Sequence, residues 1–165
     1  MFAPVTFEAL WYLPFTVPLA IWVAYSDMSR MKIPNRAVMA TFLVFVVMGF
    51  LVLPFQEYLW RYTHMLVALA VGFVLNLARL MGAGDAKFIA AFAPFIALRD
   101  LGNFAYIFAA VLIIGFVMHR SARRIPAIRG LAPQWESWDR KDFPMGLCLA
   151  GALIVYQVLT LTLLA

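Results

Sequence analysis

The chain alternates between long apolar stretches and short polar connections, a pattern that indicates helices crossing a membrane. Six apolar segments can be drawn, at residues 9–25, 37–55, 63–80, 86–98, 103–118 and 144–164. A helix that rises about 1.5 Å per residue needs about 20 residues to cross a hydrocarbon core of about 30 Å. Five segments approach or meet that length, whereas 86–98 reaches only about 20 Å. We therefore expect about six transmembrane helices, with the fourth beginning below the membrane surface.

Composition supports an all-α polytopic membrane bundle that forms one domain over residues 1–165. The 165 residues are 65% hydrophobic and only 13% charged, whereas soluble domains carry about 25% charged residues. The single cysteine, Cys148, excludes a disulfide framework and a four-thiolate zinc site, and we expect it to be a small buried side chain. His64 and His119 lie at segment ends, where we expect them to be solvated.

The basic residues are distributed unevenly, which predicts the orientation in the membrane. All but two of the 13 Lys and Arg lie in connection 26–36, around the turn between the third and fourth segments, or in connection 119–143. The exceptions, Arg61 and Arg99, lie on the other side. Because cytoplasmic connections are enriched in Lys and Arg, we expect the three basic connections to be cytoplasmic and both termini extracytoplasmic. The net charge of +5 then reflects topology, and we expect no nucleic-acid partner.

The first apolar segment could be a secretory signal or a transmembrane span. The first segment has no basic start and contains Pro14 and Pro18, so we interpret it as a span and not as a secretory signal.

Connection 119–143 is basic and carries Trp135 and Trp138. We expect it to lie on the cytoplasmic side at headgroup level and to contact anionic lipids.

Two aspartates interrupt the apolar pattern at the same predicted face. Asp27 ends the first segment, and Asp85 precedes the fourth within Met81-Gly82-Ala83-Gly84-Asp85-Ala86-Lys87. An ionisable side chain at bilayer depth costs about 2.5–3.5 kcal/mol on insertion scales, which makes each aspartate a functional hypothesis. Two carboxylates sharing one site hold a single proton over a range of pH. The ionised member can then deprotonate a water while the protonated member donates to a carbonyl oxygen, so the pair predicts peptide hydrolysis without a metal or other cofactor.

The glycines beside Asp85 bear on this chemistry. Gly82 and Gly84 lack Cβ atoms, so we expect that the turn can adopt positive φ and that a substrate backbone can approach closely. Asp85 begins a predicted helix, where the dipole favours the ionised form, whereas Asp27 follows the end of one. The sequence therefore favours Asp27 as the proton carrier.

The sequence also suggests roles for other polar residues. Pro34 and Asn35 follow the first aspartate and are expected to shape the site through the turn they form. Lys87 does not share a helix face with Asp85, and it either neutralises the pair or a substrate carboxylate, or extends to the interface. Asn76 and Gln157 lie within spans, where interhelical hydrogen bonds are expected.

Taken together, these motifs resemble those of the type IV prepilin peptidases, membrane aspartyl proteases of the Gly-x-Gly-Asp group. The resemblance covers roughly residues 10 to 160. It runs through Asp27 and Ile33-Pro34-Asn35, then Gly82-Ala83-Gly84-Asp85-Ala86-Lys87, and ends in Phe143-Pro144-Met145-Gly146 at the start of the last span.

The resemblance implies that Asp27 and Asp85 are the two catalytic aspartates. Its members remove a short basic leader from prepilin-like precursors inserted in the inner membrane, at the cytoplasmic face. The short connection between Asp27 and Arg36 and the absence of Cys-x-x-Cys make the chain similar to the peptidase-only form that serves Flp-type (tight-adherence) pili and archaeal preflagellins. We therefore do not expect N-methyltransferase activity.

Three alternatives remain. A proton-coupled carrier or channel subunit would use the aspartates as relays, but it should place them near the midplane on broken helices in both halves. A pilus-assembly scaffold would need neither aspartate beyond folding. A presenilin-like protease shares Gly-x-Gly-Asp, but it has more spans and a Tyr-Asp motif within one, whereas Tyr25-Ser26-Asp27 lies at the end of a span.

Overall fold

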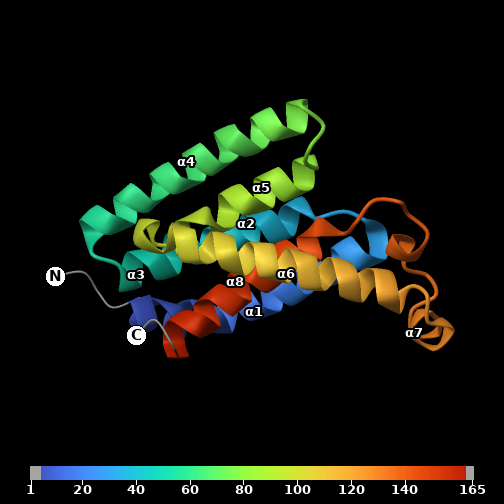
Figure 1. Cartoon of the computed structure of the whole chain (residues 1–165). Helices are drawn as coiled ribbons and strands as arrows, with labels where there is room; N and C mark the ends of the chain where they lie inside the picture. Colours follow the sequence, from blue (N-terminus) through green and yellow to red (C-terminus); the bar gives the residue numbers. More distant parts are fainter. Residues whose placement is uncertain (1–4, 163–165) are drawn as a thin grey trace.

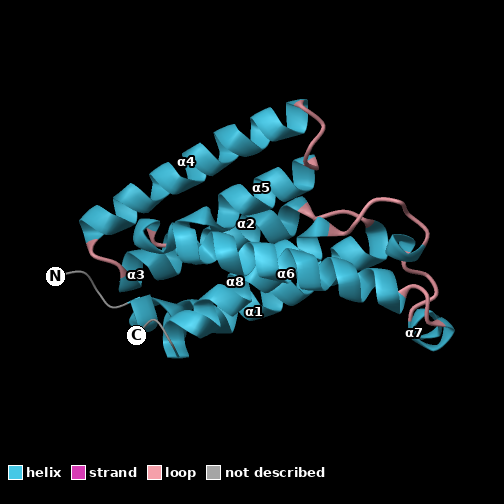
Figure 2. Ribbon diagram, in the orientation of Figure 1, coloured by secondary structure: helices cyan, strands magenta, loops and turns pink. Residues whose placement is uncertain are grey.

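The computed structural model describes residues 5–162, and these residues form helices without strands (Figures 1 and 2). Five helical stretches are long and apolar enough to cross a membrane. They are α1 (Val5–Arg30), the stretch Asn35–Val52, α4 (Phe55–Leu77), α6 (Leu101–Ala122) and α8 (Met145–Thr162). The predicted all-α polytopic membrane bundle is confirmed.

The second stretch is helical throughout but changes its winding. It consists of α2 (Asn35–Val44), a π-helical turn at Phe45–Gly49 and α3 (Phe50–Val52). Phe45 in the wide turn is fully buried, and its ring stacks on Tyr58 of α4 with the ring centres 5.7 Å apart. The wide turn therefore places an aromatic ring in the core.

α4 begins at Phe55, whereas the sequence pattern placed the start of the third segment at residue 63. The prediction was wrong because Arg61 is not in a polar connection but is buried within the helix, with 1% of its surface exposed. Its Nη2 donates to Glu8 Oε2 at 3.0 Å and to Glu57 Oε1 at 2.7 Å, and its Nη1 donates to the Pro94 carbonyl oxygen at 3.0 Å. A guanidinium whose donors are satisfied in this way is tolerated inside a span.

The fourth segment is short, as predicted. α5 (Ala83–Phe92) has 10 residues and continues into a 3₁₀ turn at Ala93–Phe95. At about 1.5 Å per residue, α5 is about 15 Å long and does not cross a bilayer by itself. It packs closely on α4, since a Cβ on Gly72 would lie 2.9 Å from the Cβ of Ala86. Small residues at this crossing fix the position of the first turn of α5.

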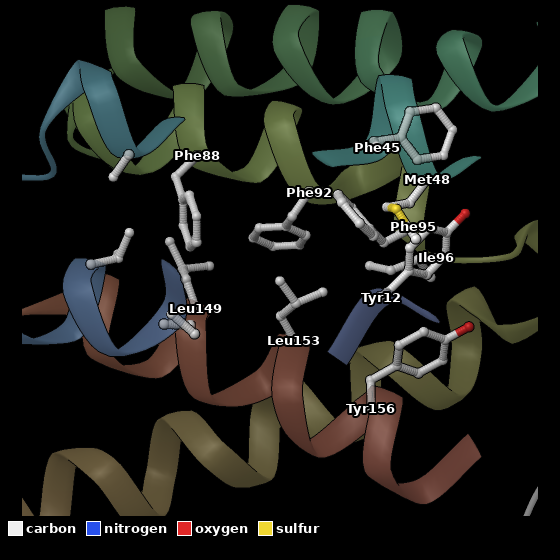
Figure 3. Packing of buried hydrophobic residues seen from close by; sticks show 14 of the residues in the cluster. Tyr12, Phe45, Met48, Phe88, Phe92, Phe95, Ile96, Leu149, Leu153 and Tyr156 are labelled. Carbon is white, nitrogen blue, oxygen red and sulfur yellow. The ribbon is translucent and has the colours of Figure 1, made fainter. Parts of the chain in front are cut away.

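The helices alternate in direction, so α1 begins and α8 ends at the same end of the bundle (Figure 1). The turns α1–α2 and α4–α5 and the connection from α6 to α8 gather at the opposite end (Figure 1). Side chains of α5, including Phe88 and Phe92, point toward Leu149 and Leu153 of α8 (Figure 3). α1 is tied to α8 by the predicted interhelical bond, in which Gln157 Oε1 accepts from a threonine hydroxyl of α1 at 2.6 Å.

Candidate active site

Asp27 lies in the last turn of α1, and the chain turns sharply just after it. Met31 adopts the left-handed conformation with φ 52°, and its N–H donates to the Asp27 carbonyl oxygen at 2.8 Å. The Ser26 hydroxyl donates to the Lys32 carbonyl oxygen at 2.9 Å and holds the turn. Ile33 then packs into the core, and the Asp27 side chain is 5% exposed.

α4 ends in a Schellman motif that leads to the second aspartate. Arg79 has φ 59°, its N–H donates to the Asn76 carbonyl oxygen at 3.0 Å, and the Leu80 N–H donates to the Leu75 carbonyl oxygen at 2.9 Å. The Asn76 side-chain amide donates to the Met81 carbonyl oxygen at 2.9 Å. Asn76 therefore closes this turn and does not join two helices, which corrects the sequence-based prediction.

The two glycines of the Gly-x-Gly-Asp sequence do not adopt positive φ, contrary to our prediction. In residues 5–162 the left-handed positions belong to the two non-glycine residues described above. Gly82 is extended, with φ −67° and ψ 145°, and caps the start of α5. A Cβ on Gly82 would lie 2.7 Å from Asp85 Oδ2, and one on Gly84 would lie 3.5 Å from the Cβ of Ile33. Gly82 thus leaves room for the carboxylate, and Gly84 lets the turn after α1 pack on α5.

Asp27 and Asp85 line the same two cavities at one end of the bundle. The larger cavity has a volume of about 730 Å³ and is bordered by charged side chains: Arg30, Lys32, Arg79, Arg140 and Asp142. The smaller has a volume of about 320 Å³, and its lining includes four of the five other predicted site residues, Asn35, Gly82, Gly84 and Lys87, but not Pro34. The structure therefore brings the two predicted aspartates together from positions distant in the sequence.

The first turn of α8 completes the surroundings of Asp27. The Gly146 N–H donates to Asp27 Oδ2 at 2.7 Å, and a Cβ on Gly146 would lie 2.9 Å from that oxygen and from Ile33 Cδ1. Backbone N–H groups at a helix N-terminus stabilise a neighbouring anion. This contact was not predicted from the sequence, although Phe143-Pro144-Met145-Gly146 was identified there as a motif.

Asp85 is half-buried and lies outside the five long helical stretches. Its burial, followed by the negative charge of Asp27, raises its pKa from 3.8 to about 6. A hydrogen bond with the Gly82 backbone acts in the opposite direction. Asp85 therefore retains a proton to a higher pH than an exposed aspartate does.

Lys87 and Asn35 line the smaller cavity together with the aspartates, and Pro34 immediately precedes Asn35 in the chain. Pro34 is extended and caps the start of α2, which begins at Asn35. The exposed Lys87 Nζ donates to Asn35 Oδ1 at 3.4 Å and so links the first turns of α5 and α2. Neither aspartate forms a salt bridge with Lys87 in the described part of the chain.

Connection 119–143 folds back onto the bundle. It contains α7 (Pro126–Leu131) and a 3₁₀ turn at Glu136–Trp138. Trp138 is 3% exposed and stacks on His119, which is itself 5% exposed. The expectation of a solvated His119 was wrong, because His119 and Trp138 bury each other against the bundle. The end of the connection reaches the larger cavity.

The remaining candidate ligands are engaged in the fold. No group of three or more His, Cys, Asp or Glu within residues 5–162 is placed to hold a metal ion. His64 is only partly exposed, and its Nδ1 lies 3.1 Å from the Ile96 carbonyl oxygen, so it is not the solvated residue we expected. Cys148 is 1% exposed and its thiol donates to the Val111 carbonyl oxygen, which confirms the predicted buried side chain.

A comparison with family models matches residues 15–119 to the type IV leader peptidase family. This match spans more than half of the chain and includes both aspartates. The chain belongs to the type IV leader peptidase family. It is therefore a peptidase of the aspartic kind and a multi-pass membrane protein. Searches of curated proteins and of solved structures gave no significant match. α8 and the Gly146 contact lie beyond the matched residues.

Proposed function

We propose that this protein is an aspartyl endopeptidase that removes a short basic leader from prepilin-like precursors inserted in the membrane. The observation that carries the proposal is the joint placement of Asp27 and Asp85 around shared cavities at one end of the bundle. The leader-peptidase family supports a precursor substrate held in the membrane. We assign the chain to the peptidase-only, Flp-type form, without N-methyltransferase activity.

In this mechanism the two carboxyl groups divide the acid and base roles around one water. The ionised Asp27, which accepts the Gly146 N–H, takes a proton from the water as the water attacks the carbonyl carbon of the substrate. Asp85, whose pKa is raised, donates its proton to the carbonyl oxygen. As the carbon–nitrogen bond of the tetrahedral intermediate breaks, the leaving nitrogen takes up the proton held by Asp27, and one hydroxyl group of the intermediate returns a proton to Asp85, which gives the product carboxyl group and restores both aspartates. This assignment reverses the sequence-based one because the N-terminus of α8 lies against Asp27.

We also propose that the aspartates face the cytoplasm and that the protein resides in the inner membrane. The basic connections gather at the aspartate end of the bundle. Since Arg61 is buried in an ion-paired cluster, Arg99 is the one basic residue near the surface of the opposite end within residues 5–162. The positive-inside rule then favours a cytoplasmic site. Anionic lipids would contact the same basic connections.

The test is leader cleavage by variants in which one carboxyl group is replaced. Asp27→Asn and Asp85→Asn should each lower cleavage of a candidate prepilin by at least about 10³-fold, because each removes a general acid or base. The matched control is Asp142→Asn, which changes a carboxylate bordering the same cavity and should leave cleavage near the wild-type rate. The new N-terminus is mapped by mass spectrometry after incubation of purified protein with the precursor in liposomes.

The same variants separate the alternatives. Retained cleavage in Asp27→Asn or Asp85→Asn would rule out the paired mechanism. A carrier would instead lose proton flux in liposomes in both variants, and a scaffold would lose neither activity.

A further inference from the structure

α4 stands apart from most of the bundle and packs mainly on α5 and the 3₁₀ turn that follows it (Figure 1). Because α5 lies between the C-terminal half of α4 and the remaining helices, a groove opens on each side of α5. The first groove lies between α2 and α4 and has a volume of about 440 Å³. Its walls are apolar: Val38, Met39 and Phe42 of α2, Met65 and Leu69 of α4, with Ala90 of α5 as part of the floor.

This first groove continues into the candidate active site. Asn35 and Lys87 line both the groove and the smaller cavity that contains Asp27 and Asp85. The hydrogen bond from Lys87 to Asn35 therefore lies at the boundary between the apolar groove and the two carboxyl groups. A chain segment lying in the groove would reach the aspartates as it leaves the groove past these two residues.

The second groove does not continue into the candidate active site. It lies between α4 and α6, is larger at about 640 Å³ and is also apolar, with Val67 and Val71 of α4 among its lining residues. None of its lining residues borders either cavity that contains the aspartates. It thus offers a matched control surface on the same helix.

We propose that the groove between α2 and α4 binds the apolar helix of the substrate, on the C-terminal side of the bond to be cut. The inference rests on the proposed function, since it takes a membrane-inserted precursor as the substrate. Three observations support this proposal. The walls of the groove are apolar, the α5 residues of its floor have small side chains that let a helix approach closely, and one end of the groove lies at the aspartates.

The groove also limits how much of the substrate helix is recognised. From Asn35 to Phe42 the α2 wall extends for about 10 Å at about 1.5 Å per residue, which corresponds to two helical turns. The first two turns of the substrate helix therefore lie in the groove, with the scissile bond beyond its Asn35 end. The flexible side chains of Met39 and Met65 allow the walls to adjust to substrates of different shape.

The first experiment captures the bound helix by a disulfide. Met65→Cys and Val67→Cys are each combined with Asp85→Asn to stop turnover, and the precursor carries a cysteine at successive positions in the first two turns of its apolar helix. Met65 faces the first groove and Val67 the second, while the native Cys148 is buried. We expect the Met65→Cys protein to capture the precursor at least about tenfold faster than the Val67→Cys protein. Equal capture, or faster capture by Val67→Cys, overturns the proposal.

The second experiment fills each groove and measures cleavage kinetics. Leu69→Trp enlarges a side chain in the first groove, and Val71→Trp does so in the second. For the full precursor we expect Leu69→Trp to raise KM about tenfold and Val71→Trp to leave it unchanged, because overfilling a binding surface costs about one power of ten in affinity. For a soluble peptide that spans the cleavage site but lacks the apolar helix, neither variant should change kcat/KM.

The outcomes distinguish the groove from the enzyme. If the wild-type protein cleaves the precursor but Leu69→Trp and Val71→Trp have the same KM for it, the proposed substrate-binding role of the groove is refuted, while the proposed peptidase function is not. If the wild-type protein cleaves no precursor, the proposed function fails and the groove fails with it.

Discussion

Gly146→Ala tests whether the N-terminus of α8 positions the carboxylate of Asp27 for the proposed reaction. In the structure the Gly146 N–H lies 2.7 Å from Asp27 Oδ2. The added methyl group would lie 2.9 Å from the same oxygen, 3.0 Å from Asp27 Cγ and 2.9 Å from Ile33 Cδ1. Non-bonded atoms prefer separations of about 3.5–4.0 Å, so the carboxylate has to move and the hydrogen bond is lost.

Two independent estimates of the effect agree. A hydrogen bond to a charged group contributes about 1.5–3 kcal/mol. Displacing a catalytic group by about 1 Å lowers the rate by about 10²-fold, which corresponds to about 2.7 kcal/mol of activation free energy. We therefore expect kcat/KM for leader cleavage to fall about 100-fold in Gly146→Ala.

The assay combines cleavage kinetics with thermal unfolding in the same detergent, so that a lost fold is distinguished from a misplaced carboxylate. The matched control is Gly151→Ala in the same helix, where the nearest atom to the new Cβ, Val111 Cγ1, is 3.4 Å away. We expect this control to stay within about twofold of wild type, since its neighbour has to yield only slightly. If folded Gly146→Ala cleaves as fast as Gly151→Ala, α8 does not position Asp27.

Three further predictions concern the second aspartate and the opposite end of the bundle. Gly82→Ala should lower kcat/KM at least about tenfold more than Gly84→Ala does. The Cβ added at Gly82 would lie 2.7 Å from Asp85 Oδ2, whereas the nearest neighbour of a Cβ added at Gly84 is 3.5 Å away. The raised pKa of Asp85, about 6 against 3.8, means that the folded protein binds the proton more tightly than the unfolded chain. The melting temperature should therefore fall as pH rises through this window, and Asp85→Asn should reduce that fall. Arg61→Met should cost about 3–5 kcal/mol of stability by leaving the buried carboxylate of Glu8 without its partner, whereas Arg99→Met at an exposed position should change the melting temperature little.

The sequence predicts most of the architecture because span length and apolar composition are local properties. The short fourth helix and the shared end of the two aspartates follow from them directly. Arg61 shows where such reasoning fails. From the sequence alone its charge indicates a polar connection, and only the fold brings Glu8 of α1 within reach of Arg61 as a partner. A residue's partners from a distant helix cannot be inferred from its own neighbourhood in the chain.

The turns beside the site were mispredicted for a related reason. Positive φ was assigned to glycines because glycine adopts it without steric cost. The structure instead places Met31 and Arg79 in the left-handed region. Met31 follows α1, which carries Asp27, and Arg79 lies in the turn between α4 and Asp85. Such a residue costs about 1–2 kcal/mol, which the hydrogen bonds of the two helix ends offset. Sequence propensity describes the isolated residue and does not include these bonds.

Both carboxyl groups lie against a glycine at the start of a helix, and this shared arrangement supports our proposal that the pair holds a single proton. Gly82 caps the start of α5 beside Asp85, and Gly146 lies in the first turn of α8 beside Asp27. Helix N-termini favour the anionic form, while burial and mutual repulsion oppose a second negative charge. The two effects together favour one ionised and one protonated carboxyl group. Only one of these contacts is visible locally, because Gly82 is three residues from Asp85 whereas Gly146 is 119 residues from Asp27.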